Sequence, residues 1–177
     1  MDFVKIMFPF TNSIYKLQKE KLLISPPFGN YISLRNPNVY SVKGSFTLEH
    51  RGGIKELAWQ IIKTLRYSFK YGGWKNKIGL RNKGIDWALE KYNDVDEFNK
   101  HSIMSIAILD PSEINVFNEK IPQKMNLEIN VSCKNTEHDL VCDGIEQFLN
   151  PSREWCFIKL SPNTTMEMVD MYYKQGF

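Results

Sequence analysis

The sequence predicts an α/β domain built on about five parallel strands. Short apolar runs without polar alternation recur along the chain, and such runs fit strands that are covered on both faces. Segments with helical spacing stand between these runs, which is the order of parallel α/β folds. Polar residues gather directly after the runs, at the sheet edge where such folds bind their ligands. The fold class and a functional edge are therefore both expected from the pattern alone.

The composition is that of one globular domain. The chain has 177 residues, of which 42% are hydrophobic and 24% are charged, and this length can bury a core of its own. The formal net charge is only +3, and no long run of like charges stands anywhere in the sequence. We therefore expect no nucleic-acid partner.

The cysteines and the N-terminus exclude further classes. The 3 cysteines form no Cys-x-x-Cys pair, which argues against a disulfide framework and a structural zinc site, so we expect no metal and a reducing, cytoplasmic compartment. The first ten residues are apolar but are interrupted by Asp2, Lys5 and Pro9. Such a segment is too short for a signal peptide or a membrane span, and we expect no membrane partner.

Five segments have the length and flanks of buried strands. Each is rich in Val, Ile, Leu or aromatic residues and is bounded by residues that favour turns. They are residues 22–24, 40–46, 103–109, 127–131 and 155–160.

Helical spacing is clearest in residues 54–65, where apolar side chains form one stripe. The stripe consists of Ile54, Leu57, Ala58, Ile61, Ile62 and Leu65. A second helix is expected over residues 114–121, because Asp110 can cap it and Pro111 suits a first helical turn.

Two more helices are expected in the C-terminal third. One covers residues 144–149, and the last covers about residues 165–174. Thr164 or Thr165 would cap the last helix, and Gly176 would end it.

Four segments resemble the dihydroorotate dehydrogenases, in the order in which that family has them. They are Gly-Ser-Phe-Thr at 44–47, Asn-Lys-Ile-Gly-Leu-Arg-Asn-Lys-Gly-Ile-Asp at 76–86, Glu-Ile-Asn-Val-Ser-Cys-Lys-Asn-Thr at 128–136 and Lys-Leu-Ser-Pro-Asn at 159–163. The resemblance covers the chain from about residue 20 to the end, and residues 1–20 form a poorly matched extension.

The resemblance implies a fold and a reaction. The family oxidises dihydroorotate to orotate with FMN, on an eight-stranded (β/α) barrel of the TIM type. Residues 1–177 would then be one domain, a partial TIM barrel that lacks the C-terminal strands 6–8. The loops after strands seven and eight, which hold the FMN phosphate, would also be missing.

The resemblance also assigns roles to residues. Substrate-binding residues would be Asn76, Gly79, Leu80, Asn130 and Asn135, the general base would be Cys133, and Ser45 and Lys159 would contact the flavin. The chemistry suits these types: a base must take a proton from carbon, an amide both donates and accepts, and a lysine stabilises negative charge on a reduced flavin.

Three positions depart from the family pattern. Lys134 stands where the family has a proline, and Ile108 stands near a position where the family usually has glycine. Lys43 is followed by Gly44, whereas the family's substrate-binding lysine is followed by serine. We therefore assign Lys43 no substrate role.

Two hypotheses follow from the resemblance. The chain is an FMN-dependent oxidoreductase of the dihydroorotate dehydrogenase type, active when a partner completes the barrel. That partner would be a second copy or a chain that carries the other half, because five strands leave open edges and an apolar inner face. The alternative is an inactive half-barrel pseudoenzyme that serves as a structural or interaction subunit.

Overall fold

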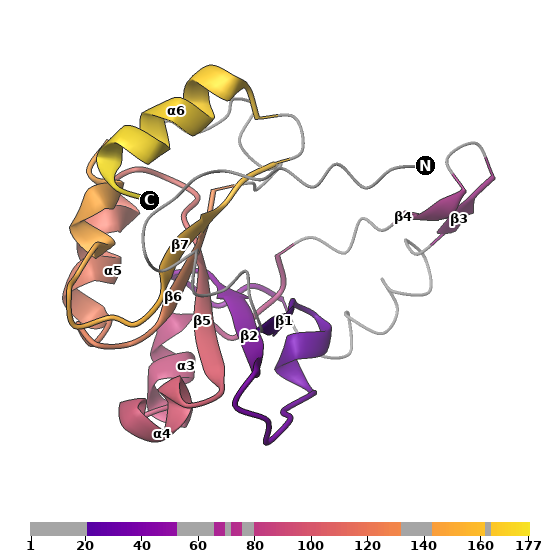
Figure 1. Ribbon diagram of the computed structural model, residues 1–177, viewed down its shortest axis with the longest axis horizontal. Coiled ribbons are helices and arrows are strands. Elements are labelled where there is room, and N and C mark those ends of the chain that lie inside the picture. Colours follow the sequence, from indigo (N-terminus) through magenta and orange to yellow (C-terminus); the bar gives the residue numbers. More distant parts are fainter. Residues whose placement is uncertain (1–20, 53–65, 70–71, 76–79, 132–142, 162–163) are drawn as a thin grey trace.

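A five-stranded parallel sheet forms the centre of the protein (Figure 1). The computed structural model describes residues 21–52, 66–69, 72–75, 80–131, 143–161 and 164–177. The strand order is β1-β2-β5-β6-β7, and all four neighbouring pairs are parallel. The strands are β1 Leu22–Ile24, β2 Val39–Phe46, β5 Ser102–Ala107, β6 Leu127–Asn130 and β7 Cys156–Lys159. The sheet curls into a half-barrel, which confirms the predicted α/β class and partial TIM barrel.

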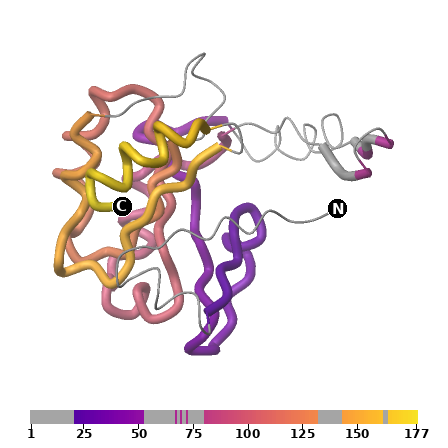
Figure 2. Tube along the Cα trace, turned by 45° about the horizontal axis from the view of Figure 1, so that its top comes forward, coloured from indigo at the N-terminus to yellow at the C-terminus, as the bar shows by residue number. Residues whose placement is uncertain are grey.

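Helices cover one face of this sheet. They are α3 Ile85–Lys91, α4 Val95–Asn99, α5 Glu113–Lys120 and α6 Met166–Gln175, with 3-10 turns η1 Phe28–Asn30 and η2 Ile145–Phe148. A separate antiparallel pair joins β3 Arg66–Ser68 to β4 Gly73–Lys75. Figure 2 follows the chain from the indigo β1–β2 edge to the yellow α6, so the sequence order is also the order across the sheet.

The core explains why the strand segments do not alternate between apolar and polar residues. Met104 of β5 and Leu127 of β6 are fully buried in the larger cluster, which packs the sheet against the helices. Ile103, which precedes Met104, points to the opposite face of the sheet and is fully buried in a smaller cluster with Val42 and Trp155. Both faces therefore bury apolar side chains, each worth about 1.5–3 kcal/mol when fully buried.

The predicted strands are confirmed, with small shifts at their ends. The third was expected over residues 103–109 and ends at Ala107. It stops there because the Leu109 N–H donates to the Glu113 carboxylate (2.9 Å) instead of a neighbouring strand.

The last predicted helix is confirmed with its caps. The Thr165 hydroxyl accepts from the Met168 N–H (3.4 Å), and Gly176 ends α6 with a φ of 108°. The segment 144–149 was wrongly predicted as an α-helix and forms the 3-10 turn η2. Only a single tight turn fits there, between Gly144 at a φ of 90° and Pro151. The predicted helix over residues 54–65 and the extension 1–20 lie outside the described residues.

Two short helices, α3 and α4, were not predicted as separate elements. Of the residues of α3, only Ile85 and Ala88 are fully buried, and α4 buries Phe98. Because each helix buries so few apolar side chains, the sequence shows no apolar stripe with helical spacing there. Within the described ranges, no helix has the length and apolar character to cross a membrane, and no group of three metal-ligating side chains occurs.

Candidate functional site

A chain of polar side chains crosses the C-terminal edge of the sheet, from β2 to β7. The Ser45 and Ser105 hydroxyls lie 2.6 Å apart, and Ser105 donates to the Glu128 carboxylate (2.7 Å). The Lys159 ammonium donates to the same carboxylate oxygen (2.9 Å). The Asn130 amide donates to Ser45 (3.0 Å), which completes the set. We call these five residues the polar layer.

Strand register places the polar layer on one face. Ser105 stands opposite Glu128, and Asn130 stands opposite Lys159, in parallel pairing. Glu128 and Asn130 are two residues apart on one strand, so their side chains share a face. Ile103 precedes Ser105 by the same step, so the polar layer continues the face of the smaller core cluster, away from the helices.

The electrostatics of the polar layer depend on Glu128. This residue is only 3% exposed, and a buried carboxylate is costly unless it is paired. Lys159 supplies the opposite charge, and its side chain keeps 36% exposure. Because an ammonium has three N–H donors and Glu128 takes one, Lys159 can also donate to a ligand at the edge of the sheet.

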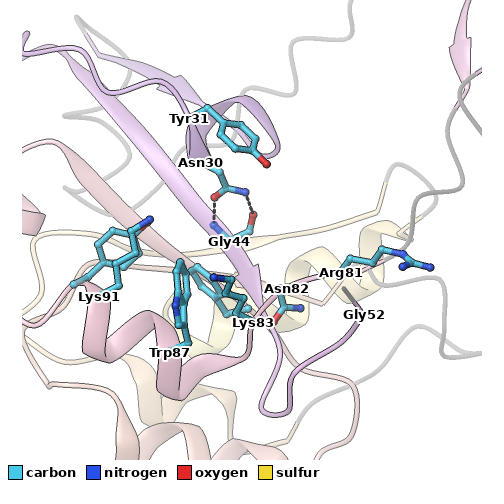
Figure 3. Close-up of a pocket in the computed structure, with 11 residues that line it drawn as sticks. Asn30, Tyr31, Gly44, Gly52, Arg81, Asn82, Lys83, Trp87 and Lys91 are labelled. Atoms are coloured by element: carbon cyan, nitrogen blue, oxygen red, sulfur yellow. Dashed lines mark hydrogen bonds between the residues drawn. The ribbon is translucent and has the colours of Figure 1, made fainter. Parts of the chain in front are cut away.

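A local irregularity in β2 brings Ser45 to the polar layer. The register of β2 with β5 shifts around Gly44, which has a φ of 120°. A Cβ on Gly44 would lie 2.4 Å from the Ser105 carbonyl oxygen, so no side chain fits. Asn30 holds the other side of Gly44, accepting from its N–H (2.7 Å) and donating to its carbonyl (3.1 Å), as Figure 3 shows.

A second segment of the resemblance joins the turn after β2. The Asn82 amide oxygen accepts from the N–H groups of Thr47 (3.1 Å) and Gly84 (2.8 Å). Arg51 and Asn82 also exchange two backbone hydrogen bonds. Leu80, which is half-buried, precedes Asn82 by two residues and so lies on this loop.

The structure brings together three of the residues that the sequence singled out. Ser45, Asn130 and Lys159 belong to one hydrogen-bonded chain, although 85 positions separate Ser45 from Asn130. Leu80 lies on the neighbouring loop. The other predicted site residues lie outside the described ranges: Asn76, Gly79, Cys133 and Asn135.

Sequence reasoning missed Ser105, Glu128 and Asn82. Glu128 and Asn82 stand inside the quoted segments but received no role. The alternation rule could have found Glu128, because it shares a strand face with Asn130. Ser105 could have been found as a polar residue in the middle of an apolar strand, where it must have a buried partner.

Lys43 lies on the opposite face from Lys159. It is 5% exposed, and its ammonium donates to the Gly29 carbonyl (2.6 Å) and the Ser33 hydroxyl (2.9 Å). Burial, and after it the charge of Lys91, lower the pKa of the Lys43 ammonium. Lys43 is therefore not part of the polar layer.

The chain is similar to catalytic subunits of one enzyme type. No family model matches it. Three relatives bear the name dihydroorotate dehydrogenase B (NAD(+)), catalytic subunit. The protein of Geobacter metallireducens is 29% identical over 81% of this chain and 48% of its own length. The protein of Pelobacter propionicus is 28% identical to this chain, over 78% of this chain and 47% of its own length. The protein of Alkaliphilus metalliredigens is 25% identical, over 78% of this chain and 47% of its own length. This chain spans about half the length of these relatives. Together with the parallel half-barrel, the similarity shows that the chain is related to the dihydroorotate dehydrogenases over part of their catalytic subunit.

Proposed function

We propose that the chain supplies one half of the active site of an FMN-dependent oxidoreductase that converts dihydroorotate to orotate, a step of pyrimidine biosynthesis. The observation that carries this proposal is the polar layer. Four strands direct its hydroxyl, amide, carboxylate and ammonium groups to the C-terminal edge, which is where parallel barrels bind their ligands. The names of the relatives support the substrate.

The donor set of the polar layer fits a flavin ring. The pyrimidine edge of a flavin requires hydrogen-bond donors and a nearby positive charge, since negative charge collects there on reduction. Lys159 offers both and remains partly exposed, and the Ser45 hydroxyl lies in the same hydrogen-bonded chain. FMN, when bound, would accept the hydride that leaves dihydroorotate.

Three residues of the polar layer have distinct parts in this proposal. Lys159 stabilises the negative charge, and Glu128 holds the ammonium in place. Asn130 offers an amide to the substrate, as would Asn76 and Asn135, while Gly79 and Leu80 would contact the substrate ring. Cys133 would take the proton from the substrate carbon.

A partner is part of the proposal. The phosphate of FMN would bind to loops that follow strands beyond the five described here. A second copy, or a chain that carries the remaining strands, would supply those loops and cover the edges at β1 and β7.

The open sheet also favours a second candidate function. In the described residues five strands form the sheet, and the chain covers 47–48% of three of its relatives. An inactive subunit, with a structural or interaction role, would keep the polar layer only because Glu128 needs its partners once it is buried.

Visible absorbance separates the two functions. We would record the spectrum of the purified chain with added FMN, alone and after co-expression with the C-terminal half of the Geobacter metallireducens relative. A perturbed flavin spectrum in either sample, weakened by Lys159→Met but not by Lys174→Met, supports the oxidoreductase. An unchanged FMN spectrum in both samples contradicts it and favours the inactive subunit.

A further inference from the structure

A cavity of about 340 Å³ lies between β2, the segment after η1 and helix α3 (Figure 3). Asn30 and Tyr31 line one side, and Trp87 and Lys91 line the other. No residue of the polar layer lines it. Its volume falls within the range of small-molecule sites, which is about 300–1,000 Å³. We call it the α3 pocket.

Two lysines gather around one indole in the α3 pocket. Trp87 and Lys91 are spaced by four residues within α3 and so lie on one side of the helix, and Lys83 precedes the helix by two residues. The two ammonium groups lie 4.6 Å and 4.8 Å from the Trp87 ring centroid. An aromatic ring attracts each cation, but it does not cancel the charge of either.

Among the described residues that line the α3 pocket, none carries a carboxylate. Within the described ranges, neither Lys83 nor Lys91 forms an ion pair, and one acid of α3 and one of α4 have other partners. Asp86 pairs with a lysine of α5 (2.6 Å), and Glu97 pairs with the lysine after α4 (2.5 Å). The lining therefore carries an excess of positive charge.

The positive field of Lys91 reaches a neighbouring group. It contributes, after burial, to the lowered pKa of Lys43. Like charges held close together raise the free energy of the protein until an anion joins them. The chemistry of the lining thus selects for anionic ligands.

The opposite wall of the α3 pocket offers a flat aromatic surface. Tyr31 follows Asn30, which is held to Gly44 by two hydrogen bonds, so the backbone beside Tyr31 is fixed. The Tyr31 residue is 79% exposed. Figure 3 shows its ring across the pocket from Trp87 and Lys91.

We propose that the α3 pocket binds a small organic anion that combines a planar ring with a phosphate, the chemistry of a nucleoside monophosphate. The phosphate contacts Lys83 and Lys91, and the ring packs on Tyr31. This site is separate from the polar layer and does not rest on the proposed function.

Isothermal titration calorimetry tests the α3 pocket with AMP, UMP, uridine and inorganic phosphate as probes. We expect at least one nucleotide to bind, and uridine and phosphate alone to bind about tenfold more weakly or not at all, since each makes only part of the contacts. The double variant Lys83→Gln/Lys91→Gln should lower nucleotide affinity about tenfold or more. Tyr31→Ala should lower nucleotide affinity but leave phosphate binding unchanged.

A matched control removes the same charge elsewhere. Lys124→Gln/Lys174→Gln also loses two lysines, and neither lines the α3 pocket. We expect this variant to bind nucleotide as the wild type does, with far-ultraviolet circular dichroism confirming the fold of both variants. The proposal is overturned if neither nucleotide binds at millimolar concentration, or if the two double variants lose affinity equally.

Discussion

The polar layer and the α3 pocket both contain lysines at a candidate ligand site, but only in the polar layer is the lysine charge paired with a carboxylate. In the polar layer, Lys159 is paired with Glu128, a carboxylate that is 3% exposed. In the α3 pocket, Lys83 and Lys91 have an indole ring as their neighbour. The first arrangement is fixed by strand register and belongs to the core. The second lies on a helix surface, so its charge is available to a ligand and contributes little to folding.

Lys159→Met should have the largest effect on stability. It leaves the Glu128 carboxylate buried without an opposite charge, and such losses cost about 3–5 kcal/mol. Urea unfolding followed by circular dichroism measures the change. The double variant Lys159→Met/Glu128→Leu should recover part of the loss, because it removes the unpaired charge. Equal stability of Lys159→Met and wild type would mean that the pair is not part of the core.

Gly44→Ala should have the next largest effect. A Cβ there would lie 2.4 Å from a backbone oxygen of β5, at a φ of 120°, so β2 must shift at a cost of about 2–4 kcal/mol. Gly72→Ala is the matched control, since Gly72 also has a positive φ but a Cβ added to it would meet no atom within 4 Å. Similar losses of stability in the two variants would show that the positive φ alone explains the need for glycine at position 44, and that the contact with β5 does not contribute.

The pH dependence of Lys43 should be smaller and confined to alkaline solution. Its pKa in the folded state is lowered from 10.5, so the unfolded chain binds more protons between the two pKa values. The free energy of unfolding should therefore rise with pH in the window just below 10.5. Below that window Lys43 is charged in the folded protein, so the full free-energy cost of burying its charge is present. Urea midpoints between pH 8 and 10.5 should rise more for wild type than for Lys43→Met. Parallel curves would contradict the burial of a charged Lys43.

Lys83→Gln/Lys91→Gln should change stability least. The two side chains are exposed, and exposed surface changes stay within about 0.5 kcal/mol. The same urea experiment checks this value. A loss as large as that of Lys159→Met would show that these lysines hold the fold, and would remove the contrast between the two regions.

The sequence predicted the sheet better than the site. Strands such as 40–46 were recognisable because both faces of the sheet bury apolar residues, which leaves continuous apolar runs. Ser45, Asn130 and Lys159 were found through the resemblance. Ser105 and Glu128 stand out locally as polar residues in apolar strands, but the contact that joins them lies between two strands and shows only in the folded chain. The α3 pocket was missed for the same reason, since Tyr31 and Trp87 meet there only in the folded chain.

Anaerobic reduction by dihydroorotate tests the central claim most directly. We would mix dihydroorotate with the flavin-loaded protein, together with the chain that completes the barrel, and follow the flavin absorbance in the visible range. We expect bleaching of the flavin band with formation of one orotate for each flavin reduced, and a slower reaction for Lys159→Met. Flavin that is bound but stays oxidised in the presence of dihydroorotate would contradict the proposed reaction.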